Sequence, residues 1–275
     1  MILVKKYKDV QEGFTFVKNY KKSIITNFYP DEVKITRWIL SKIFFKIEIG
    51  ESIFFVKKSK EFYSLYFISS SFDGFEISLS LLTRQNPDLI LVADVVTKDE
   101  NTPILNLFKK CDFYQYTSLL RMSRMVSNPI LELENNIYLK EATQNHIDEL
   151  IVLFEKHFDP IAEQLPVKSD LLNWIETGSL LIYEINNKIG GFIIYDLNGL
   201  TLYLRYWFVH PDFRDQKIGS LLFNYFLYKG RNTKRQIFWV IQSNDNAIKR
   251  YKHYGFVEEK MYNFVMINKN KRYEK

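Results

Sequence analysis

The pattern of apolar and polar positions between residues 200 and 230 predicts a strand, a polar loop and a helix. Residues 202–209 are rich in β-branched and aromatic side chains, and Pro211 cannot donate to a sheet ladder, so the strand ends before it. Five apolar residues then recur at the i, i+3, i+4, i+7 and i+8 spacing of a helix that stops near Gly230: Ile218, Leu221, Leu222, Tyr225 and Phe226. A loop over residues 212–219 joins the two elements.

Apolar periodicity predicts alternating strands and helices in the rest of the chain as well. In the first half, the expected strands are 2–4, 52–57, 62–69 and 89–96, and the expected helices are 9–22, 30–43 and 75–82. In the second half, the expected strands are 137–139, 180–185, 191–195, 237–241 and a closing strand to 267, and the expected helices are 143–154, 170–176 and one around Tyr251. The sequence therefore predicts an α/β (α+β) protein.

The loop over residues 212–219 has the features of an anion site. The first N–H groups of a helix have no intrahelical partner, and they point with the positive end of the helix dipole toward one place. Arg214 and Lys217 add positive side chains, and Gly219 lets a ligand approach the backbone closely. We expect a diphosphate to bind here.

Two segments resemble motifs of the GNAT superfamily of N-acetyltransferases. Residues 209–214 match Val-x-Pro-x-x-Arg, and residues 214–219 match Arg/Gln-x-x-Gly-x-Gly/Ala, except that Lys217 replaces the first glycine. A lysine that must adopt a positive φ there would be mildly strained. The later motif, Asn-x-x-Ala-x-x-x-Tyr-x-x-x-Gly-Phe, is matched at every position: Asn244, Ala247, Tyr251, Gly255 and Phe256.

The resemblance implies acetyl-CoA as co-substrate, with no metal. It assigns cofactor binding to Phe208, Val209, Arg214, Gln216, Lys217, Ile218, Gly219, Ser220 and Asn244. It also implies that an amine attacks the thioester directly while a backbone N–H near Val209 holds the developing oxyanion. Tyr251 would protonate the departing thiolate. The alternative for Tyr251 is a purely structural core aromatic.

The general base is less well defined by the sequence. Members of the superfamily often carry a glutamate on the central strand, but residues 202–209 contain no acid. The candidates are Glu184 on a neighbouring strand, His210 and Glu163, and we assign the role to Glu184. The alternatives are a water relay and a structural role for each of these side chains.

Alternation along the central strand places Arg205 on one face with Tyr203 and Trp207, and we assign substrate binding to these three residues. If this face lines the acceptor cleft, a cation flanked by aromatic rings suggests an acceptor with a carboxylate. The alternative is that Arg205 pairs with a structural acid such as Asp196.

The first half of the chain contains a weaker copy of the later motif. Residues 94–113 align with residues 239–256, which places Ile104 on Ala247, Phe108 on Tyr251, Asp112 on Gly255 and Phe113 on Phe256. The copy lacks the hydroxyl of Tyr251 and the basic loop. We therefore predict two GNAT-like domains, each a mixed, mostly antiparallel sheet flanked by helices: residues 1–130, degenerate and inert, and residues 131–275, the acetyltransferase. The boundary is placed at residues 127–129, and the alternative is an unrelated α/β domain with a chance match.

Composition narrows the class of protein. The 275 residues are 47% hydrophobic, which suffices for packed cores, and the net charge of +6 comes from basic residues interleaved with acids, which does not favour nucleic-acid binding. Cys111 is the single cysteine, so no intrachain disulfide or cysteine-based zinc site can form. The start of the chain turns polar too soon for a secretory signal, and no apolar run has membrane-spanning length. We expect a cytoplasmic protein with no membrane partner.

The function expected from the sequence is acetyl-CoA-dependent transfer of an acetyl group to a primary amine of a small molecule or peptide. Two alternatives stay open: a Fem-type aminoacyl transferase and a non-catalytic acyl-CoA-binding protein. The first domain either shapes the acceptor cleft or serves only as the dimerisation surface of a homodimer, and both alternatives stay open.

Overall fold

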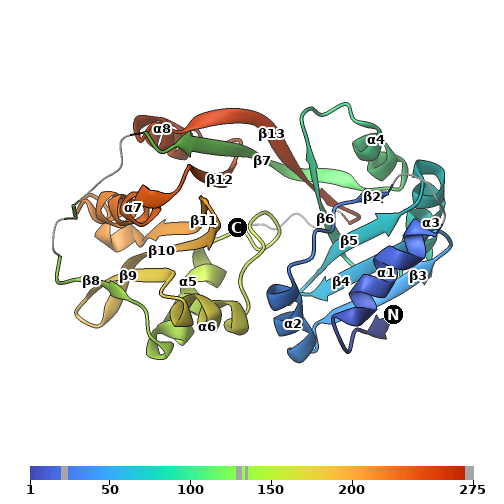
Figure 1. Cartoon of the computed structure of the whole chain (residues 1–275), viewed down its shortest axis with the longest axis horizontal. Helices are drawn as coiled ribbons and strands as arrows, with labels where there is room; N and C mark the ends of the chain where they lie inside the picture. The colour runs from blue at the N-terminus through green and yellow to red at the C-terminus, as the bar shows by residue number, and fades with distance from the viewer. Residues whose placement is uncertain (20–23, 128–131, 134–135, 270–275) are drawn as a thin grey trace. The chain divides into compact units, whose positions relative to one another are not determined.

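The computed structural model describes residues 1–19, 24–127, 132–133 and 136–269, and the chain divides into two units (Figure 1). Unit 1 contains Met1–Leu119 and the described residues from Met261 onward, and unit 2 contains Leu120–Lys260. Strands β7 and β13 contribute residues to both units. The boundary predicted near residue 130 lies within unit 2, and residues 128 and 129 are outside the described part of the chain.

The two halves of the chain run through the same order of elements. The elements from the first half are β1 (Ile2–Leu3), α1 (Lys8–Lys18), β2 (Ile25–Thr26), α2 (Glu32–Leu40), β3 (Phe44–Ile49), β4 (Ser52–Lys58), β5 (Tyr63–Ser69), α3 (Phe72–Gln85), β6 (Leu91–Thr97), α4 (Pro103–Lys110) and β7 (Tyr114–Met125). Those from the second half are β8 (Leu139–Glu141), α5 (Ile147–His157), α6 (Lys168–Glu176), β9 (Leu180–Ile185), β10 (Lys188–Asn198), β11 (Thr201–Val209), α7 (Ile218–Lys229), β12 (Arg235–Ile241), α8 (Asp245–His253) and β13 (Val257–Ile267). Apart from the short β2, the two lists correspond element by element.

The strands of each unit pair in a mixed, mostly antiparallel order, as predicted. In unit 1 the strand order is β1-β3-β4-β5-β6-β13, and in unit 2 it is β12-β11-β10-β9-β8. The parallel pairs are β5 with β6 and β11 with β12, and each of these pairs is connected through a helix, α3 or α7. In unit 2, the hairpin turn between β9 and β10 places Asn186 and Asn187 at φ 50° and 59°, as a tight turn requires.

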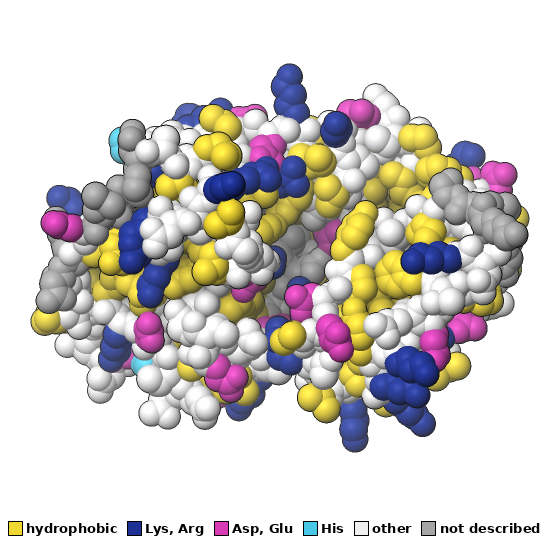
Figure 2. Space-filling view, viewed as in Figure 1, with side chains coloured by type: hydrophobic (Ala, Val, Ile, Leu, Met, Phe, Trp, Pro, Cys, Tyr) yellow, Lys and Arg dark blue, Asp and Glu magenta, His cyan; other side chains and the backbone are white. Residues whose placement is uncertain are grey.

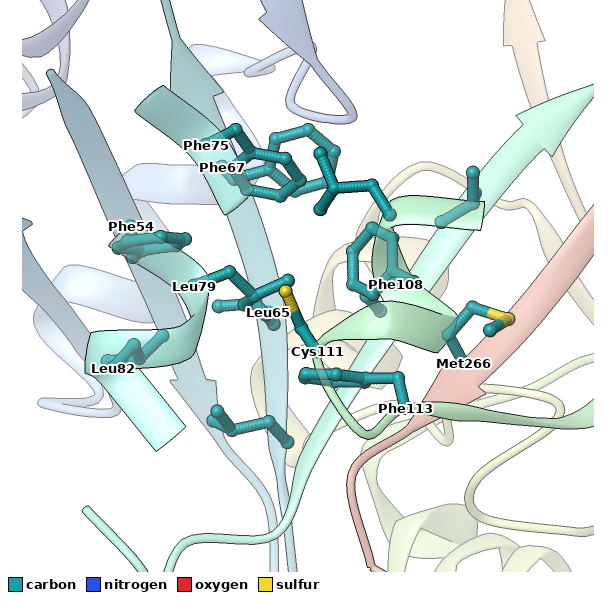
Figure 3. Close-up of a cluster of buried hydrophobic side chains, with 14 of the residues drawn as sticks. Phe54, Leu65, Phe67, Phe75, Leu79, Leu82, Phe108, Cys111, Phe113 and Met266 are labelled. Carbon is teal, nitrogen blue, oxygen red and sulfur yellow. The ribbon is translucent and has the colours of Figure 1, made fainter. Parts of the chain in front are cut away.

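Helices cover both faces of the sheet in unit 1. Apolar residues of α1 and α2, including Val10, Ile35 and Trp38, form one core, and those of α3 and α4 form the other. Figure 3 shows the second core, in which Met266 of β13 contacts the same cluster as Phe108 and Phe113. Residues 262–267 pair antiparallel with β6, so unit 1 receives its last strand from the far end of the chain.

Two sequence predictions differ from the observed elements. The helix expected to run to residue 43 ends at Leu40, and residues 44–49 form β3, a strand that the sequence analysis missed. The turn after β3 depends on Gly50, which has φ 54°. The helix expected over 9–22 is α1, and residues 20–22 lie outside the described part of the chain. No helix in the described ranges is both long and apolar enough to cross a membrane.

Candidate functional site

The loop between β11 and α7 is open to solvent. Arg214, Gln216, Lys217 and Ser220 are exposed, and no ion pair joins Arg214 or Lys217 to an acid within the described residues. The first intrahelical backbone bond of α7 runs from the N–H of Leu221 to the carbonyl oxygen of Lys217, so the earlier N–H groups of the helix have no helical acceptor. The predicted anion site is therefore not occupied by the chain's own acidic side chains.

The loop bends through two residues in the left-handed region. Lys217 has φ 60° and precedes the first residue of α7, as expected for the position where the motif has glycine, and Asp215 has φ 66°. Gly219 also has a packing role that the sequence interpretation did not include. A Cβ atom there would lie 3.3 Å from Trp207 and from Val209, so the glycine is needed for close packing of the helix on the strand.

Strands β11 and β12 form a fork. They pair at only three positions, Thr201–Tyr203 against residues 235–237, although both strands continue beyond this point. The N–H of His210 donates to the carbonyl oxygen of Gly190 at 2.9 Å. Because backbone N–H groups alternate sides along a strand, the N–H of Val209 points toward the fork and that of Phe208 toward β10.

Tyr251 packs against side chains from both strands of this fork. Its ring is 4.1 Å from the ring centroid of Phe238 on β12 and 5.5 Å from that of Trp207 on β11. Burial raises the pKa of the phenol above its usual value, the charge of Glu163 raises it further, and Arg250 lowers it. The hydroxyl therefore keeps its proton at neutral pH. Asn244 begins the helix that carries Tyr251, and its side-chain oxygen accepts from the N–H of Ala247 at 3.1 Å.

A β-bulge changes the faces of β11. Ile194 pairs with Tyr206 and Tyr195 pairs with Leu204, so Arg205 is the extra residue. After the bulge, each residue of β11 faces the side of the sheet opposite to that expected from strict alternation. The prediction that Trp207 shares a face with Tyr203 and Arg205 is therefore wrong: Trp207 packs against Phe223 of α7, whereas Tyr206 packs against α5 and α6.

Arg205 takes the structural role that the sequence left as the alternative. Its Nε lies 2.5 Å from a carboxylate oxygen of Asp196, whose other oxygen accepts from Nε1 of Trp174 at 2.6 Å. The guanidinium also stacks over the ring of Tyr203, 4.2 Å from its centroid. The carboxylate needed to neutralise Arg205 is thus supplied by the chain itself.

Glu184 is held in a network at the opposite edge of the sheet. Its carboxylate accepts from Lys140 Nζ and pairs with His146 Nε2, both at 2.7 Å. The hydrogen bond from Lys140, and to a smaller extent the one from His146, holds the pKa of Glu184 below its usual value. Such an environment opposes proton uptake by Glu184.

Glu163 lies in the segment between α5 and α6, which the Tyr206 hydroxyl ties down by donating to the carbonyl oxygens of Glu163 and Gln164 at 3.1 and 3.0 Å. Gln164 is held at φ 47°, a rare conformation for this residue type. The Glu163 carboxylate accepts from the N–H of Asp159 at 2.9 Å. Of the three candidate bases, Glu163 is the one whose charge reaches Tyr251.

One residue next to the loop was not among the candidates from the sequence. His157, the last residue of α5, has its ring 4.9 Å from that of Phe208 and 5.5 Å from that of His210. Burial lowers its pKa, and His210 lowers it further. A histidine at the end of an amphipathic helix gives no sequence signal, because its neighbours at the site come from β11.

Two further observations concern metal binding and the distribution of charge. No group of three or more His, Cys, Asp or Glu side chains that could hold a metal occurs within the described residues. On the face shown in Figure 2, Lys and Arg side chains are spread among acidic ones over both units.

Comparison with known proteins identifies the domain that carries this site. The model of the acetyltransferase (GNAT) family matches residues 147–256, a range that includes the loop, the fork and Tyr251. The chain carries a GNAT acetyltransferase domain.

An uncharacterized N-acetyltransferase of Methanocaldococcus jannaschii is 26% identical to this chain over 139 residues. The match covers 45% of this chain and 62% of the relative, so the chain spans less than two thirds of that protein's length.

Solved structures of GNAT proteins share the fold of the whole chain. A tandem GNAT protein from the clavulanic acid biosynthesis pathway has a TM-score of 0.57 at 10% identity, covering 97% of this chain and 96% of that one. A GCN5-related N-acetyltransferase from Sphaerobacter thermophilus has a TM-score of 0.57 at 13% identity, covering 79% and 76%. One from Kribbella flavida has a TM-score of 0.56 at 9% identity, covering 87% and 96%. The fold predicted from the sequence, with two GNAT-like units, is confirmed.

Proposed function

We propose that the protein transfers an acetyl group from acetyl-CoA to a primary amine of a small molecule or peptide. The observation that carries this proposal is the open loop of residues 210–217, which leads into a fork whose two strands both pack against a protonated, buried phenol. Acetyl-CoA would supply the activated acyl group as a thioester.

The residues around the fork fit the anionic and amide parts of such a ligand. Arg214, Lys217 and the free N–H groups at the start of α7 would bind the diphosphate. The N–H of Val209 faces the fork and would hold the thioester oxygen as negative charge develops on it. The side chain of Phe208 belongs to the core on the α5 and α6 side and its backbone faces β10, so the proposal gives Phe208 no contact with the ligand, contrary to the expectation from the sequence.

Two side chains would act as the general acid and the general base. Tyr251 would donate its proton to the departing thiolate, since its raised pKa keeps it protonated at neutral pH. We assign the base role to Glu163 rather than to Glu184, because Glu163 lies within electrostatic reach of Tyr251 while Glu184 is paired with Lys140 and His146. Glu163 would take the amine proton through a water molecule.

Arg205 is already neutralised by Asp196, so the proposal requires an amine on the acceptor and assigns it no anionic group. Unit 1 would be catalytically inert. The single cysteine suits a reducing compartment, and a cytoplasmic location stays a prediction.

The direct test is thiol release from acetyl-CoA in the presence of a panel of primary amines. Release that depends on an added amine is expected, and no release with any amine, together with no binding of acetyl-CoA in calorimetry, would contradict the proposal. Glu163→Gln should remove the acidic limb of the pH profile of kcat/KM. Glu176→Gln, which changes an exposed carboxylate at the end of α6, is the matched control.

A further inference from the structure

The side chain of Trp207 lies beside the fork, on the face of β11 that α7 and α8 cover. The bulge at Arg205 turns Trp207 toward α7 and α8, where its ring is 4.6 Å from that of Phe223 and 5.5 Å from that of Tyr251. The sequence interpretation had placed this tryptophan with the acceptor. Its neighbours are instead the two helices that border the fork.

The indole extends from the start of α7 toward the phenol. A Cβ atom on Gly219, in the first turn of α7, would lie 3.3 Å from Cζ2 of Trp207. The guanidinium of Arg250 lies over the indole, 5.8 Å from its centroid. Trp207 therefore lies between the loop that would bind a diphosphate and the phenol that would stand beside a thioester sulfur.

The indole N–H has no acceptor among the described residues. Nε1 of Trp207 is buried, and no oxygen of the described residues accepts a hydrogen bond from it. A buried donor without a partner is destabilising, so each instance in a native structure needs an explanation, and a ligand acceptor is one. The connection from the loop to Tyr251 is the path that the arm of a CoA thioester would follow, and this arm carries amide and thioester carbonyl oxygens.

We propose that Trp207 binds the acyl-carrying arm of the co-substrate by donating its indole N–H to a carbonyl oxygen of that arm. This proposal rests on the proposed function, since it takes acetyl-CoA as the ligand of the fork. Trp207 is thereby assigned to binding of the co-substrate and not of the acceptor. Its role is in affinity for acetyl-CoA rather than in proton transfer.

Calorimetry with two ligands tests the proposal. Trp207→Phe keeps an aromatic ring and removes the N–H. It should weaken acetyl-CoA binding roughly tenfold, the equivalent of one net hydrogen bond. Adenosine 3′-phosphate 5′-diphosphate carries the diphosphate but lacks the arm, so its affinity should change by less than about twofold.

Trp38→Phe is the matched control. Trp38 is a second tryptophan whose buried Nε1 lacks an acceptor, but it lies in unit 1, so its replacement should leave the affinity for both ligands unchanged. Unchanged acetyl-CoA affinity in Trp207→Phe, or equal weakening of both ligands, would overturn the assignment of Trp207. Wild-type protein that binds neither ligand would instead contradict the proposed function, and this assignment with it.

A second measurement uses the wild-type side chain. In protein labelled with nitrogen-15 tryptophan, the Nε1–H resonance of Trp207 should move downfield on addition of acetyl-CoA and much less on addition of the armless nucleotide. The resonance is assigned by replacing the other three tryptophans, Trp38, Trp174 and Trp239, with phenylalanine. A Trp207 resonance that does not respond to acetyl-CoA in a protein that binds it would overturn the proposal.

Discussion

The two units differ most at the junction between a strand and the helix that follows it. In unit 1, β5 and α3 are separated by residues 70–71, whereas in unit 2, β11 and α7 are separated by residues 210–217. The carboxylate of Glu51 accepts from the hydroxyls of Ser70 and Ser71 beside the first turn of α3, and Ser71 caps that helix. The start of α3 is thus satisfied by the chain itself, while the start of α7 is left open and basic. The same helix dipole therefore yields a ligand site only where the loop leaves it free.

The two units are alike at the end of the next helix. Helices α4 and α8 both end in a Schellman turn, in which the N–H of Phe113 or Phe256 bonds to the carbonyl of Phe108 or Tyr251. The aligned side chains thus have the same backbone surroundings in both units, and a single hydroxyl distinguishes them. This comparison indicates that the core residues preserve the fold, whereas one short loop and one hydroxyl account for the proposed chemistry.

The largest expected effect concerns the contribution of β13 to the stability of unit 1. Phe264→Ala removes a fully buried ring of β13 from the core shared with α3 and α4, and it should lower the free energy of unfolding of unit 1 by about 3–5 kcal/mol. Hydrogen exchange resolved along the sequence, with denaturant titration, measures the loss in each unit. Val257→Ala, at an exposed position of the same strand, is the control and should change stability by less than about 0.5 kcal/mol. Faster exchange in unit 2 alone would show that β13 does not support unit 1.

The second prediction exchanges the one hydroxyl between the units. Tyr251→Phe should lower turnover about 100-fold with little change in acetyl-CoA affinity, because it removes a proton donor and keeps the ring. Phe108→Tyr makes the reciprocal change in unit 1. When it is added to the Tyr251→Phe protein, it should restore no activity. Steady-state kinetics and calorimetry separate the two effects. A Tyr251→Phe enzyme with wild-type turnover would return Tyr251 to the role of a core aromatic.

The third prediction concerns the open loop. Arg214→Glu should weaken acetyl-CoA binding about 10- to 100-fold, since hydrogen bonds to charged groups contribute about 1.5–3 kcal/mol. The side chain is exposed, so folding should be unaffected. Asp73→Lys, which adds a positive charge to the first turn of α3, should create no binding, because Glu51 already occupies that helix end. Equal affinity of wild type and Arg214→Glu would place the diphosphate elsewhere.

The sequence predicted local features better than pairing between distant segments. The positive φ of Lys217 follows from the glycine that the motif has at this position, and it is present. The pairing of residues 262–267 with β6 was not anticipated, because an apolar strand can complete either sheet and its sequence does not specify its neighbour.

The site was predicted less completely than the fold. Strict alternation misplaced Trp207, because a bulge at Arg205 leaves no signature in the pattern of apolar residues. Glu184 was chosen from its strand, but its partners Lys140 and His146 come from elements whose position the sequence did not define. Roles that depend on one backbone turn can be read from a motif, whereas roles that depend on which strands and helices meet cannot.

The smallest expected effect compares the two Schellman turns directly. Asp112 in unit 1 and Gly255 in unit 2 occupy the same left-handed position, at φ 62° and 83°. Gly255→Ala should lower the stability of unit 2 by about 1 kcal/mol, the cost of a Cβ in this conformation. The nearest atom to that Cβ would be 3.9 Å away, on Arg124, so the loss would come from the backbone and not from a clash. Asp112→Gly should raise the stability of unit 1 by about 0.5 kcal/mol, because relief of the strained φ exceeds the added freedom of the unfolded chain. Denaturant titration followed by exchange in each unit measures both changes. A loss of stability in Asp112→Gly would mean that the aspartate side chain stabilises the turn by more than its backbone conformation costs, and that the two turns are equivalent only in their hydrogen bonds.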